Sequence, residues 1–63
     1  MSVELIEAVT IEALAQVAEN SGRSFKDTLK AWVKGDADLR EIIKNEVVHI
    51  MREMEKAKAA LAS

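Results

Sequence analysis

The sequence predicts an all-α fold of three helices, on the evidence of its chain breakers and its apolar periodicity. There is no proline among the 63 residues, and the only two glycines stand where helix ends are expected. Apolar residues recur at intervals of three and four, which is typical of helices that bury one face. We expect helices at about residues 3–20, 24–34 and 37–61.

The first helix depends on how the first nine residues are interpreted. In the helical interpretation, which is favoured, one apolar stripe follows the segment and includes Thr10; its other members are Val3, Ile6, Ala13, Leu14 and Val17. In the alternative, a short N-terminal strand, Val3 and Leu5 alternate with polar neighbours and Thr10 caps the helix that follows. No glycine or proline in this segment decides between the two.

The second helix is marked at both of its ends. Gly22 can adopt the left-handed conformation that closes the first helix, and Ser24 then serves as the N-cap of the second, with Asp27 three residues later. We expect one face to turn to the core, with Phe25 and Trp32 as its aromatic anchors; this face comprises Phe25, Leu29, Trp32 and Val33. A stripe of lysines four residues apart lies beside it, at Lys26, Lys30 and Lys34.

The third helix follows Gly35 and opens at Asp36 or Asp38, the latter forming a capping-box pattern with Glu41. Its apolar positions begin at Leu39 and become a heptad seam from Ile43 onward. A helix of this length reaches ~37 Å, too long for so small a globule to cover. We therefore expect a homodimer or higher oligomer through this helix, whose interface comprises Ile43, Val47, Ile50, Met54, Ala57 and Leu61.

Charges beside the seam favour a parallel pair, in which Glu53 faces Lys58 of the partner. The alternative is that the seam packs on the first two helices of the same chain. Both arrangements can hold in an intertwined dimer.

Composition indicates one small domain, with residues 1–35 as a binding unit and residues 36–63 as an oligomerisation helix. The net charge is −2, but it is unevenly distributed. Residues 1–20 carry four glutamates and no basic side chain, whereas residues 21–35 carry four basic side chains and one aspartate. No apolar run is long enough for a membrane span, there is no cysteine, and the N-terminus does not resemble a signal peptide. We expect a cytoplasmic protein with no membrane association.

The segment IEALAQVAENSGRSFKDTLKAWV resembles the ribbon-helix-helix DNA-binding regulators, the group containing Arc and MetJ. The resemblance covers about residues 10–35. It lies in the order of Leu14 and Ala18, then Gly22-Arg23-Ser24, and then the apolar positions of the second helix. It implies that an N-terminal strand from each of two chains enters the major groove, and that the start of the second helix clamps a phosphate through Ser24 and Arg23.

A helix-turn-helix interpretation of the same segment competes with this one. In it the second helix is the recognition helix and offers Lys26 and Lys30 to the groove. Together, the two interpretations predict five nucleic-acid-binding residues: Arg23, Ser24, Lys26, Lys30 and Lys34.

Other chemistry is less well supported. Glu46 and His49 form a Glu-x-x-His step with Glu53 one turn further on, which is suitable for a metal if each first helix adds a glutamate. The favoured interpretation is a solvated rim of the seam, with no metal and no other cofactor. No nucleophile, base and acid fall into a catalytic pattern, so we expect no enzymatic activity.

The sequence therefore predicts a small dimeric DNA-binding transcriptional regulator. The alternative is a non-enzymatic adaptor or inhibitor that binds a regulatory partner protein. That protein would bind through the apolar seam of the third helix or through the acidic first helix, whose glutamates are Glu4, Glu7, Glu12 and Glu19.

Overall fold

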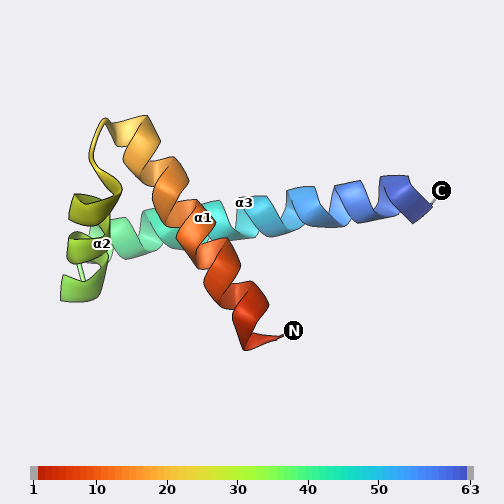
Figure 1. Ribbon diagram of the computed structural model, residues 1–63, viewed down its shortest axis with the longest axis horizontal. Helices are drawn as coiled ribbons and strands as arrows, with labels where there is room; N and C mark the ends of the chain where they lie inside the picture. Colours follow the sequence, from red (N-terminus) through yellow and green to blue (C-terminus); the bar gives the residue numbers. More distant parts are fainter. Residues whose placement is uncertain (1, 63) are drawn as a thin grey trace.

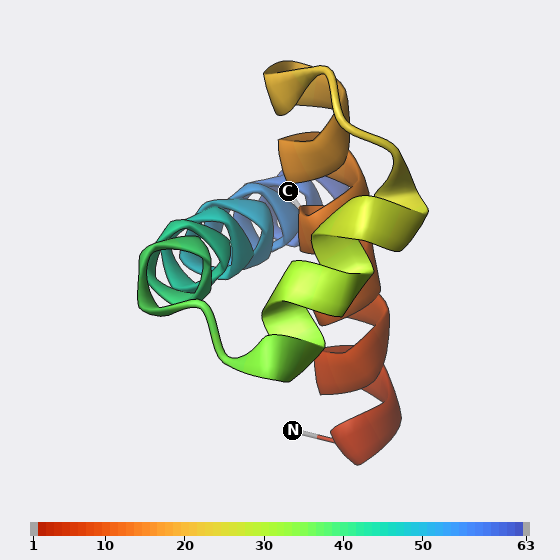
Figure 2. The same cartoon turned by 90° about the vertical axis from the view of Figure 1, so that its left-hand side faces the viewer.

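The computed structural model describes residues 2–62, so the two ends of the expected 1–63 domain fall outside it. The described chain forms three α-helices and no strand: α1 (Val3–Ser21), α2 (Phe25–Lys34) and α3 (Ala37–Ala62). α1 crosses α3, and α2 lies across α1 close to the end where α3 begins (Figures 1 and 2). The all-α prediction is confirmed, and each predicted helix bound agrees to within one residue.

The alternative of a short N-terminal strand is wrong, because α1 begins at Val3. The Ser2 hydroxyl accepts a hydrogen bond from the backbone N–H of Leu5 at 3.2 Å, and the Ser2 carbonyl accepts one from Ile6 at 3.2 Å. Ser2 is thus a helix N-cap that satisfies an otherwise unpaired amide. The helix at residues 3–9 also departs from the strand that the ribbon-helix-helix resemblance implies.

Glycine ends both of the first two helices, as predicted. Gly22 has φ +70° and Gly35 has φ +87°, both in the left-handed region. The next residue after each glycine donates back across the last turn, Arg23 to the Ala18 carbonyl at 3.0 Å and Asp36 to the Ala31 carbonyl at 3.2 Å. This pattern satisfies carbonyls that the helix itself leaves unpaired and reverses the chain within a few residues.

Serine and aspartate start the helices that follow these turns. The Ser24 hydroxyl accepts from the Asp27 N–H at 3.1 Å, and the Asp36 carboxylate accepts from the Leu39 N–H at 3.0 Å. Of the two candidates for the start of α3, Asp36 is therefore the cap, whereas Asp38 lies in the first turn.

The core is small and lies where α1, α2 and the first half of α3 meet. Its central members are Ala13 and Leu14 of α1 with Leu39 and Ile43 of α3. Partly buried side chains pack around this cluster, namely Val17, Ala31, Trp32, Val47 and Ile50. Alanine at position 13 is fully buried and allows α1 and α3 to approach closely.

The predicted inner face of α2 is confirmed for Trp32 and wrong for its other three residues. Thr28 is 1% exposed, and Ala31 and Trp32 of the same helix pack on the core. Three of the four predicted core residues are instead exposed, namely Phe25, Leu29 and Val33. The helix is rotated because small Thr28 and Ala31 bring its backbone close to the core, whereas the larger trio would hold it away.

The predicted dimer seam of α3 is divided by the crossing with α1. Ile43 is buried within its own chain, and Val47 and Ile50 pack against the same core, so these three residues are occupied. The rest of the seam, Met54, Ala57 and Leu61, is exposed. An interface through the whole of the predicted seam is therefore wrong, because α1 of the same chain already covers its first half.

Candidate nucleic-acid interface

The lysine edge of α2, defined as Lys26, Lys30 and Lys34, is an exposed row of positive charge. The three side chains follow one another four residues apart, so their Cα atoms rise about 12 Å along the helix. All three lie away from the core contacts of Thr28, which are on the opposite side of the helix. Within residues 2–62, no side-chain hydrogen bond or ion pair engages these ammonium groups.

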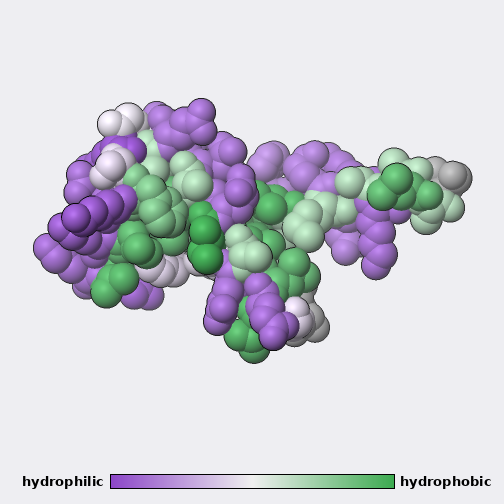
Figure 3. Space-filling view, viewed as in Figure 1, coloured by the Kyte–Doolittle hydropathy of each residue, from purple (hydrophilic) through white to green (hydrophobic). Residues whose placement is uncertain are grey.

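An apolar flank, defined as Phe25, Leu29 and Val33, runs beside the lysine edge. Val33 is 72% exposed, and Phe25 and Leu29 are each about two-fifths exposed. Leu29 and Val33 line a shallow depression together with Lys30 and Lys34. Hydrophilic and apolar surfaces consequently lie side by side over α2, at the left of Figure 3. Sequence periodicity identified both rows but placed the apolar one inward.

Arg23 and Ser24 are not joined to the lysine edge. Arg23 lines a cleft with Asp36 and Asp38, so two carboxylates share its surroundings. The Ser24 hydroxyl is already engaged as the cap of α2. An anion near Arg23 would therefore have these aspartates in the same cleft, and their negative charge would oppose its binding. The structure thus separates the five predicted residues into an exposed lysine row and a turn of mixed charge.

The acidic residues of α1 are exposed along the length of the helix. Glu4, Glu7, Glu12 and Glu19 are all exposed, although Glu7 lies on the side of the helix that buries Leu14, and Glu12 lines a cleft with α3. The exposed charge of α1 is negative, whereas that of the lysine edge of α2 is positive. Charge is therefore unevenly distributed over a molecule whose net charge is only −2. Such polarity orients charged partners during encounter.

The alternative metal residues Glu46, His49 and Glu53 line one cleft, together with Glu12 and Gln16 of α1. Glu12 is thus a glutamate of the first helix that lies in the same cleft as the three predicted residues. Among the described residues, however, no three His, Cys, Asp or Glu side chains converge closely enough to hold a metal ion.

No family model, curated protein or solved structure matches this chain, so the resemblance to ribbon-helix-helix regulators stays a prediction. Among residues 2–62, none of the three helices combines the length and apolarity needed to cross a bilayer.

Sequence reasoning missed one polar contact that shapes this surface. Arg40 of α3 stacks on Trp32 of α2, at 5.1 Å from the ring centroid. Its position eight residues beyond Trp32 crosses a glycine turn, so no helical spacing could have indicated it.

Proposed function

We propose that this protein is a small dimeric DNA-binding regulator that contacts the phosphate backbone through the lysine edge of α2. The observation that carries the proposal is the row of three exposed lysines, which are unpaired within the described chain. A row of flexible ammonium groups about 12 Å long can reach successive phosphates of one DNA strand.

Contacts of this kind position a protein on DNA but do not read its sequence. A dimer doubles the number of neutralised phosphates and matches the two-fold symmetry of paired half-sites. We assign no phosphate contact to Arg23, because Asp36 and Asp38 share its cleft.

A gel-shift titration with a charge-reversed lysine edge tests the proposal. The variant Lys26→Glu/Lys30→Glu should abolish binding to duplex DNA at low salt. The matched control Lys44→Glu/Lys56→Glu makes the same change in net charge on exposed positions of α3, and should retain binding. Parent-like binding by the α2 variant would overturn the proposal, and so would equal losses by the two variants.

A second candidate function is protein binding, which the exposed apolar flank of α2 favours. A flank of Phe25, Leu29 and Val33 beside lysines is complementary to a partner protein that has an apolar site with carboxylates at its rim. A Leu29→Asp/Val33→Asp variant would then lose a stoichiometric partner that the parent retains from its source cells. Retention of that partner by the variant would contradict this candidate.

A further inference from the structure

α1 and α3 extend beyond their crossing as two uncovered arms. We define the α1 arm as residues 3–8 and the α3 arm as residues 51–62. The arms diverge in Figure 1, and the molecule measures 42 × 24 × 17 Å. Its Cα radius of gyration is 12.9 Å, whereas a compact chain of this length has about 10.6 Å. The arms account for the elongated shape.

Each arm continues an apolar stripe that is buried at the crossing. On α1 the stripe runs from Leu14 and Ala13, which are buried, to Ile6 and Val3, which are exposed. On α3 it runs from buried Ile43 to exposed Met54 and Leu61. Val3 is 69% exposed and Leu61 is 89% exposed. Both arms thus carry the same apolar spacing as the buried parts of their helices, but no other part of the described chain covers it.

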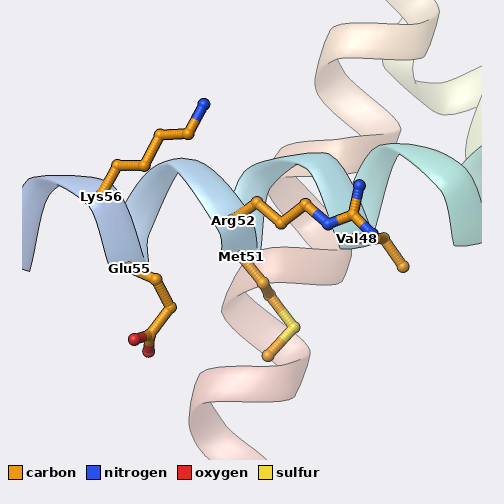
Figure 4. Close-up of a pocket in the computed structure, with 5 residues that line it drawn as sticks. All are labelled: Val48, Met51, Arg52, Glu55 and Lys56. Carbon is orange, nitrogen blue, oxygen red and sulfur yellow. The ribbon is translucent and has the colours of Figure 1, made fainter.

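Where the two arms leave the crossing, their apolar side chains line a common cleft. Leu5 and Val9 of α1 line a small cleft with Met51, Met54 and Glu55 of α3. In Figure 4, the Met51 side chain extends on the side of α3 where Glu55 lies, whereas Lys56 points to the opposite side. Arg52 extends along the helix toward Val48. Apolar surface therefore continues from this cleft along α3 toward the crossing, through Met51 to Val48.

The chain exposes more area than a compact monomer of its mass, and the excess is comparable to one partner's share of a standard interface. A monomer of this mass exposes about 4,000 Å² when it is compact. This chain exposes 4864 Å². The excess is about 800 Å², which is the share that each partner contributes to a standard protein interface.

We infer that a second copy of this chain covers both arms, with the α1 arm of each protomer packed on the α3 arm of its partner. A two-fold axis perpendicular to the two helices makes the two α1 helices antiparallel in one layer and the two α3 helices antiparallel in the other. Each α1 then crosses its own α3 near Ala13 and the partner's α3 near Val3 and Ile6. The arrangement is isologous and closes at two copies.

Charge supports this pairing of arms. Glu7 lies one helical turn from Val3 on the α1 arm, and Lys58 lies one turn from Leu61 on the α3 arm. Crossing the arms brings an acidic residue of one protomer near a basic residue of the other. The same crossing then forms at both ends of the dimer, so the pairing is made twice.

This inference rests on the dimer of the proposed function and names its surface, and it leaves the lysine edge of α2 uncovered. The arms can also be tested without DNA. The chain has no cysteine, so single cysteines introduced on the two arms report their contacts directly.

The experiment mixes two single-cysteine variants of the full chain, Ile6→Cys and Ala57→Cys, unfolds and refolds them together, and oxidises them. We expect a covalent dimer on a non-reducing gel from the mixture and none from either variant alone. A second pair, Val3→Cys with Leu61→Cys, guards against a small offset in register. Ala8→Cys with Ala59→Cys, both exposed and off the apolar stripes, is the matched control and should not cross-link.

Three results would overturn the inference. A covalent dimer from Ala57→Cys alone indicates that two α3 helices meet each other at this residue, and the absence of cross-linking in both mixed pairs indicates that the arms do not meet. Light scattering gives an independent measurement, in which the parent has twice the 7.0 kDa chain mass. Ile6→Asp should raise the dimer dissociation constant on the order of tenfold or more. A parent that is a folded monomer at micromolar concentration also overturns it.

The outcome is separable from that of the proposed function. A cross-linked dimer that fails to bind DNA would remove the lysine-edge proposal and retain the arm interface. A monomer whose DNA binding depends on Lys26 and Lys30 would do the reverse.

Discussion

The guanidinium of Arg40 lies over the indole of Trp32, with 5.1 Å between the Cζ atom and the ring centroid. Its Nη2 atom also donates a hydrogen bond to the Trp32 carbonyl at 3.3 Å. Trp32 is in the last turn of α2 and Arg40 is in the first turn of α3. One side chain therefore combines a cation–π contact with a positive charge at the C-terminus of a helix. The pair helps fix the direction in which α3 leaves α2.

Replacing Arg40 with alanine should lower the free energy of unfolding by about 1 kcal/mol, because the contact is only partly shielded from solvent. Trp32 is the only tryptophan, so its fluorescence follows urea unfolding and also reports the loss of the stacked cation. Arg52→Ala, an exposed arginine further along α3, is the control. Equal losses in the two variants would contradict a specific role for Arg40.

Thr28 is a buried polar residue whose hydroxyl is satisfied locally. Its Oγ1 atom donates to the Ser24 carbonyl at 3.1 Å, and the same carbonyl accepts the Thr28 backbone N–H at 3.1 Å. In Thr28→Val the carbonyl keeps one of its two donors, so we expect a change of less than about 1 kcal/mol in stability. Thr28→Asp places a charge in the same site and should cost about 3 kcal/mol or more. Thermal unfolding of the two variants measures this contrast, and similar melting temperatures would contradict the placement of Thr28 in the core.

The helix bounds could be predicted because their signals are local. Gly22 and Gly35 adopt left-handed φ values within their own turns, and Ser24 caps a helix through an amide three residues away. Such interactions depend on a few consecutive residues, and a single sequence contains all the information they need. The predicted lysine row followed from the same periodicity.

The orientation of α2 could not be predicted, because it depends on packing among three helices. Hydrophobicity alone favoured Phe25, Leu29 and Val33 as the inner face, yet Thr28 and Ala31 lie inward. Either face of α2 could be buried on the basis of its apolar content. The face with the smaller side chains is buried because it lets the helices pack more closely. Likewise, the seam on α3 showed that Ile43 and Leu61 share a face but not that α1 would cover only the first of them.

Gly22 has a backbone conformation that other residues adopt at a cost. Its φ is +70°, and a Cβ atom added there would meet no atom within 4 Å, so backbone strain is the only penalty expected. Gly22→Ala should lower the free energy of unfolding by about 1–2 kcal/mol. Gly22→Asn should lose less, because asparagine tolerates the left-handed region. Urea titration checks the order of the three proteins, and a variant Gly22→Ala as stable as the parent would contradict the left-handed turn.

The lysine edge makes a quantitative prediction about salt. If each ammonium neutralises one phosphate, a plot of the logarithm of DNA affinity against the logarithm of salt concentration has a slope of about −2.7 per protomer, and of about −5.4 for a dimer with both edges bound. Lys30→Gln removes one contact from each protomer without adding negative charge, so the slope for the dimer should become shallower by about 1.8.

The control Lys44→Gln removes an exposed charge from α3 and should leave this slope unchanged. Fluorescence anisotropy with a labelled duplex between 50 and 200 mM salt, on the order of the range over which such contacts lose most of their affinity, provides the measurement. A slope that responds equally to both variants would indicate a diffuse attraction to the whole molecule. A slope near zero would mean that phosphates are not the ligand of α2, and its apolar flank would then be the better guide to function.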